Sequence, residues 1–140
     1  MRRRLLLLLL PLSLTAATCG GYGHEDETSP PPSGSLGPVT AEAADEAILG
    51  LCALVGETDP EAAEATFVDR SHRTLHVIAA AAEAEDRAAA GRLLEAKQVV
   101  EADLQEDDLP AGFPADVEAL LEAANAALAT IGLESTGCEA

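Results

Sequence analysis

The sequence predicts a small all-α protein, a bundle of three or four helices that follows an N-terminal leader and a disordered tether. Three observations favour this fold class. Beyond residue 39, apolar residues recur at the 3.6-residue period of amphipathic helices. Aromatic residues make up only 2% of the chain, whereas strands favour aromatic and β-branched side chains. With 140 residues, part of them in the leader, the chain has room for one small domain.

The charge balance is strongly acidic and narrows the classes of partner. The chain has 25 acidic and 8 basic residues, and Arg2, Arg3 and Arg4 of the basic ones lie in the leader. Nucleic-acid binding depends on Lys and Arg that neutralise phosphates, so we expect no nucleic-acid partner. Electrostatic attachment to anionic lipid is disfavoured for the same reason. The charge suits a cation or a basic partner, and the simpler interpretation is a solvated acidic surface.

Residues 1–18 have the layout of a secretory signal peptide. A positive n-region precedes an apolar run of about ten residues, from Leu5 to Leu14, that Pro11 interrupts. A helix that spans a bilayer needs about 20 apolar residues, so this run is too short for a permanent membrane anchor. We therefore expect the leader to be removed.

The end of the leader resembles the lipobox of bacterial lipoproteins, because it reads Thr15-Ala16-Ala17-Thr18-Cys19-Gly20. In that family, a stretch of small residues ends at a cysteine that is acylated and becomes the new N-terminus. Ala16 stands where leucine is commonest, and Thr18 where Gly, Ala or Ser is usual. The resemblance implies lipidation of Cys19 and an acyl anchor in the cell membrane, on its extracytoplasmic face. Ordinary cleavage near Ala17, which gives a secreted protein without a lipid anchor, is the alternative.

Residues 19–38 are predicted to form a disordered tether. They show no periodicity, are rich in Gly, Ser and Pro, and include the run Pro30-Pro31-Pro32. A flexible chain of this length has a root-mean-square span of about 25 Å. Such a spacer would let an acidic helical domain, residues 39–140, clear the membrane surface.

The first helix of that domain is expected to begin after Thr40, a plausible N-cap. Glu42 and Asp45 follow in the early turns, where acids suit the helix dipole. Gly56 ends the pattern. The predicted apolar face consists of Ala44, Ile48, Leu51, Cys52 and Val55.

Helical periodicity returns over residues 60–104, with Thr58 or Asp59 as the expected cap. One straight helix of these 45 residues would extend about 67 Å, too far for a domain of this size. Residues 83–91 lack large apolar side chains, and Asp86 can cap a new helix there, so we expect a kink or a turn near Asp86. The predicted apolar faces hold Phe67, Val68, Thr74, Leu75, Ile78, Ala79 and Ala82 before it, and Leu93, Leu94, Ala96, Val99, Val100 and Leu104 after it.

The last helix has the most regular pattern on the chain. Before it, the acidic run 106–108 and the Pro/Gly-rich segment 110–114 stop the preceding helix. Gly132 closes the last helix. Its apolar face consists of Val117, Leu120, Leu121, Ala124, Ala127, Leu128 and Ile131.

The sharpest candidate for chemistry is a metal site. His72 and His76 are spaced i, i+4, so both imidazoles can reach one divalent transition-metal ion from a single helix. On an ideal helical wheel, Asp69 and Glu83 fall with them inside about 60°. The H-E-x-x-H motif of zinc proteases is absent. The simpler interpretation is that these side chains form surface ion pairs at the edge of the core.

Catalysis is not indicated by the sequence. Ser71 and His72 are adjacent, so on a helix they diverge and cannot act as a nucleophile and its base. No glycine-rich loop follows a strand pattern, so a phosphate-binding loop is unsupported. We expect a protein that is not an enzyme and needs no cofactor.

The remaining cysteines, Cys52 and Cys138, form an even pair in an oxidising compartment, so we expect a disulfide between them. In a four-helix path that reverses at every turn, the ends of the first and last helices lie about 25 Å apart. The tail after Gly132 covers about 20 Å, which makes the bridge barely feasible there. A path that only kinks near Asp86 brings the two ends together, and we favour that path.

These features predict a membrane-tethered envelope lipoprotein whose helical domain binds or structurally supports another envelope component, such as an envelope protein. The alternative is a metal-binding lipoprotein that uses Asp69, His72 and His76.

Overall fold

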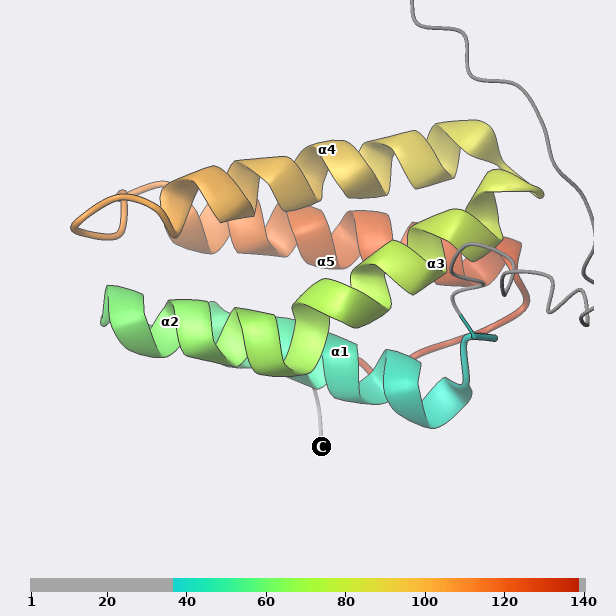
Figure 1. The fold of residues 1–140 in the computed structure, drawn as a ribbon, viewed down its shortest axis with the longest axis horizontal. Helices are drawn as coiled ribbons and strands as arrows, with labels where there is room; N and C mark the ends of the chain where they lie inside the picture. The colour runs from blue at the N-terminus through green and yellow to red at the C-terminus, as the bar shows by residue number, and fades with distance from the viewer. Residues whose placement is uncertain (1–36, 139–140) are drawn as a thin grey trace, which may run out of the picture. The chain divides into compact units, whose positions relative to one another are not determined.

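The computed structural model describes residues 37–138; the leader, Cys19 and nearly all of the predicted tether lie outside this range. The described residues contain helices and no strand. In chain order the elements are α1 (Ala41–Leu54), α2 (Pro60–Thr66), the π-helical segment η1 (Phe67–His72), α3 (Arg73–Glu83), α4 (Arg87–Asp103) and α5 (Phe113–Thr130). The predicted all-α bundle is confirmed. Because α2, η1 and α3 follow one another without a break, they form one long bent helix beside α1, α4 and α5 (Figure 1).

α1 and α2 begin at polar residues that cap them. Thr40 Oγ1 accepts a hydrogen bond from the Ala43 backbone N–H at 3.2 Å at the start of α1. Asp59 Oδ1 accepts one from Ala62 N–H at 2.9 Å at the start of α2, with proline in the first helical position. These bonds satisfy donors that the first helical turn leaves unpaired.

The chain reverses direction between α3 and α4. The Asp86 N–H donates to the Ala82 carbonyl at 2.8 Å, and Asp86 Oδ1 accepts from Ala88 and Ala89 N–H at 2.9 and 3.0 Å. One residue therefore ends α3 and begins α4, which packs back along α3 (Figure 1). The break lies at the predicted residue, but the predicted path, a kink that continues in the same direction, is wrong. The buried residues on both sides of the turn are alanines, which let the two helices pack closely as a hairpin: Ala79, Ala82, Ala89 and Ala90.

The core is built of alanine and branched aliphatic side chains, with Phe67 and Phe113 as its largest members. Three residues predicted on apolar faces are instead exposed: Val68 by 53%, Leu94 by 37% and Val99 by 47%. For Val68 the reason is the wider π-helical turn, which changes the angular spacing of residues 67–72 from that of an α-helix. For α4 the reason is that its buried face is centred on Leu93, Lys97, Val100 and Leu104.

Cys52 and Cys138 form the predicted disulfide, with Cα atoms 5.4 Å apart. It forms within the simple reversing path, because the segment after α5 crosses back along α1 (Figure 1). On the way, the Thr136 N–H donates to Asp45 Oδ1 at 2.8 Å. Gly132 and Gly137 take positive φ angles of 72° and 71°, which side-chain-bearing residues rarely adopt. The disulfide, which we expected to be barely feasible on the reversing path, thus forms because the tail is extended.

Within residues 37–138, no helix is both long enough and apolar enough to cross a membrane.

Candidate functional site

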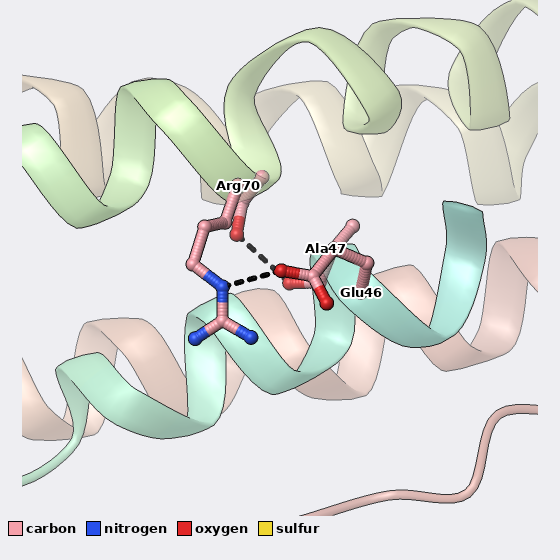
Figure 2. Close-up of polar contacts among 4 residues, drawn as sticks. Glu46, Ala47 and Arg70 are labelled. Atoms are coloured by element: carbon pink, nitrogen blue, oxygen red, sulfur yellow. Dashed lines mark hydrogen bonds and ion pairs between the residues drawn. The ribbon is translucent and has the colours of Figure 1, made fainter. Parts of the chain in front are cut away.

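The candidate site begins at η1, the π-helical turn inside the long bent helix. This turn is fixed against α1. Ser71 Oγ, which is buried, donates to the Ala47 carbonyl at 2.8 Å, and Arg70 Nε donates to Glu46 Oε1 at 2.6 Å (Figure 2). α1 can approach so closely because residue 50 is glycine: a Cβ there would overlap Ser71 Oγ and lie 2.8 Å from Arg70 Cβ.

On the opposite side of the long bent helix, two histidines face α4. The rings of His72 and His76 meet edge to face, with centroids 5.0 Å apart. The His72 ring also meets the Phe67 ring edge-on at 5.8 Å, and its Nε2 lies 3.0 Å from Glu101 Oε1 on α4. The i, i+4 spacing thus places the two imidazoles together, as predicted.

A buried lysine completes this cluster. Lys97 is only 3% exposed, and its Nζ donates to Glu101 Oε1 and lies 6.0 Å from the centroid of the Phe67 ring. Buried ammonium groups need a partner, and here one carboxylate serves both Lys97 and His72.

Neither Lys97 nor Glu101 was among the predicted site residues, although a signal was present. Lys97 follows Leu93 by four residues and precedes Val100 by three, which is the spacing of the buried face. A lysine in the middle of an apolar helical face indicates a buried charge, and Glu101 one turn later is its nearest acid in sequence.

Burial lowers the pKa of His76 from its ordinary value, and electrostatic interaction first with Lys97 and then with His72 lowers it further. The Glu101 carboxylate opposes this shift. His76 is therefore a neutral imidazole near pH 7, with one N–H donor and one acceptor nitrogen.

Beside the histidines lies an open groove between α3 and α4, with a cavity volume of about 550 Å³ (the α3–α4 groove). His72, Arg73 and His76 line the end near η1, and Glu83 and Arg87 line the end near the turn. The walls between them are apolar and mostly small: Ala79, Ala80, Ala90, Gly91 and Leu94. The groove thus combines an apolar middle with polar ends.

The four predicted metal ligands are not gathered in one place. His72 and His76 are neighbours, whereas the Glu83 carboxylate lies 3.9 Å from Arg87 Nε at the far end of the groove. Asp69 is exposed and is not part of the groove lining. In residues 37–138, no three His, Cys, Asp or Glu side chains are arranged to hold a metal ion. Residues 67–72 form a π-helical turn, so a helical wheel that assumes 3.6 residues per turn does not describe the relative positions of Asp69 and His72.

Chemically, the α3–α4 groove offers an apolar surface, imidazole nitrogens and two guanidinium groups within reach of one small molecule. The nearby Ser71 hydroxyl is buried on the α1 side and already donates to a backbone carbonyl. This arrangement is suited to holding a ligand. The chain matches no family model, and no curated protein and no solved structure is detectably similar to it.

Proposed function

We propose that this protein is a non-enzymatic, extracytoplasmic binding domain, held at the membrane by an acyl anchor on Cys19, and that the α3–α4 groove is its binding site. The observation that carries the binding role is the groove itself. Its volume of about 550 Å³ lies in the usual range for small-molecule sites, and its apolar walls end in a few polar groups, as such sites do.

Two features support the location. The segment around Cys19 resembles a lipobox, and the Cys52–Cys138 disulfide is of a kind that persists in oxidising, extracytoplasmic compartments. Secretion without an acyl anchor is the alternative, and the variant Cys19→Ala distinguishes the anchored from the secreted form. We expect wild-type protein to partition into detergent with the membrane fraction, and Cys19→Ala to accumulate as precursor or to be mislocalised. Soluble mature wild-type protein that begins at Thr18 would contradict the anchor.

The binding role is tested by thermal unfolding of the chain from residue 20 to residue 140. The core lies between Val39 and Leu133, so this chain keeps all of it. Chromatographic fractions of an envelope extract from the producing cell are added one at a time. A ligand at 100 times its Kd stabilises the folded state by about 2.7 kcal/mol.

We expect at least one fraction to raise the Tm of the wild type. The same fraction should raise the Tm of Ala102→Leu, a control at an exposed position of α4. It should not raise the Tm of Gly91→Leu, because the leucine side chain fills the groove. No stabilising fraction, or equal stabilisation of Gly91→Leu, would refute the α3–α4 groove as the binding site.

A second candidate is a transition-metal site, favoured by the contact between the His72 and His76 rings. Neutral imidazoles at i, i+4 can both ligate one ion. Protein purified without chelator or affinity tag should then hold a divalent metal stoichiometrically, and the double variant His72→Ala, His76→Ala should lose it without losing helicity. Equal metal content in both proteins would remove this site from consideration.

A further inference from the structure

We infer that the ligand of the α3–α4 groove is a small amphipathic organic anion, whose charged head lies at Arg73 and the histidines and whose apolar body covers Gly91. This inference rests on the proposed function and names the chemical class of its ligand. Two independent observations carry it: the glycine in the wall of the groove, and an arginine at its end that has no ion-pair partner within residues 37–138.

Gly91 lies inside α4, where glycine is the least favourable residue after proline. Nothing in the packing of the bundle requires it. Its backbone is helical, and a Cβ added there would meet no packed neighbour within 4 Å. A glycine that packing does not need leaves the middle of the groove open to an apolar body, beside Ala80 and the part-exposed Leu94.

Arg73 supplies the charge. Among residues 37–138, Arg70 and Lys97 have carboxylate partners close by, and Arg87 has a more distant one, whereas Arg73 and Arg92 have none within 4.0 Å. Of these two arginines, only Arg73 lines the α3–α4 groove. Arg73 lies at the groove end that also holds the two imidazoles.

Glu101 and Glu83 already have basic partners. Glu101 is bound by Lys97 and His72, and Glu83 faces Arg87 at the other end. Histidines aside, two arginines and one glutamate give the groove lining one net positive charge, in a chain whose net charge is −17. A guanidinium that has no carboxylate partner, with N–H donors beside it, is the chemistry that recognises a carboxylate or sulfonate head.

The test uses 1-anilinonaphthalene-8-sulfonate, a fluorescent amphipathic anion, with the chain from residue 20 to residue 140. Octanoate and 1-octanol, which share an eight-carbon body and differ in head charge, compete with it. We expect octanoate to displace the probe at concentrations at least tenfold lower than 1-octanol. Gly91→Leu should weaken the binding of both the probe and octanoate at least tenfold. Gly91→Ala adds only a Cβ and should retain binding of both.

Arg73→Gln should remove the tenfold preference for octanoate over 1-octanol. Its matched control is Arg92→Gln, because Arg92 is another exposed arginine that has no carboxylate within 4.0 Å among the described residues, and it lies outside this groove. Ala102→Leu is the control for Gly91→Leu. Both controls should bind like the wild type, and circular dichroism and Tm establish that each variant is folded.

The outcomes separate the two proposals. Unchanged probe binding by folded Gly91→Leu overturns the inference together with the groove as a binding site. If the wild type binds neither the probe nor octanoate, the anionic ligand is overturned, and the extract fractions alone decide whether the groove is a binding site. A third outcome is that Gly91→Leu loses binding, while 1-octanol competes as well as octanoate and Arg73→Gln has no effect. This outcome keeps the groove as a binding site and overturns the anionic ligand.

Discussion

Gly50 in α1 and Gly91 in α4 both stand within alanine-rich helices, yet the surfaces around them differ. At Gly50, η1 lies so close to α1 that a Cβ would overlap Ser71 Oγ. At Gly91, the space beyond the helix is empty. Gly50 thus allows two helical segments to pack closely, whereas Gly91 leaves an unfilled space beside α4. The comparison shows that the structural role of a glycine inside a helix depends on what packs against it. The sequence of the helix alone does not give that neighbour.

α1 also carries Cys52 of the disulfide, and removing that bond should give the largest effect. The bond joins residues separated by 86 positions, and chain entropy assigns such a loop about 4–5 kcal/mol of stabilisation. Cys52→Ser with Cys138→Ser should lower the free energy of unfolding by about that amount in urea titrations. Non-reducing peptide mapping of the wild type checks the bond, and free thiols at both positions would contradict it.

Gly50→Ala tests the close approach of α1 and η1. Alanine favours the helix by about 1 kcal/mol, but overpacking costs about 1–3 kcal/mol. Loss of the buried Ser71 hydrogen bond adds about 1 kcal/mol, so we expect a net loss of about 2 kcal/mol.

The same substitution in a Ser71→Ala background should cost less, because the nearest obstacle to the new Cβ is then gone. Equal costs in both backgrounds would mean that the Ser71 contact does not limit the approach of the helices.

Gly91→Ala should have the opposite sign. The new Cβ meets nothing, so the gain in helix propensity remains uncompensated, and the free energy of unfolding should rise by about 1 kcal/mol. Chemical denaturation of the ligand-free chain measures this change. A destabilised Gly91→Ala would show that the open side is packed after all, and the contrast with Gly50 would fail.

The smallest effect is the pH dependence from His76 at the edge of the groove. Its folded-state pKa is lowered, first by burial and then by Lys97 and His72, against Glu101. The unfolded state therefore binds the proton more tightly. The stability contribution is complete above the unfolded pKa, about 6.5, and is lost as the pH falls from there through the folded value.

Wild type should thus lose more stability than His76→Gln between pH 7.5 and pH 5.5. An NMR titration of the His76 ring should give a midpoint below about 6.5. A midpoint at or above that value would contradict the lowered pKa.

Apart from the disulfide, the features that the sequence predicted correctly are local ones. The caps at Thr40, Asp59 and Asp86 depend on residues within three positions of one another, and the disulfide follows from counting cysteines. The direction of α4 was mispredicted, because helical periodicity describes which face is apolar and not which way the next helix runs.

The site was predicted only in part. The i, i+4 histidines were found, since their spacing is a property of one helix. The π-helical turn at residues 67–72 was not predicted, because helical-wheel analysis assumes 3.6 residues per turn throughout. Glu101 lies opposite His72 only because α4 folds back, so its role depends on the reversal that the sequence left open.

The tail that crosses α1 also decides how the domain carries mechanical load. When the oxidised chain is stretched between residues 37 and 138, the covalent path runs through α1 to Cys52 and then directly across the bond to Cys138. Everything from α2 to α5 lies inside the closed loop and cannot lengthen. Only residues 37–52 can extend, to a fully stretched length of about 55 Å. A pull from the tether would therefore unwind α1 alone, while α3 and α4, the two walls of the groove, stay outside the path of the force.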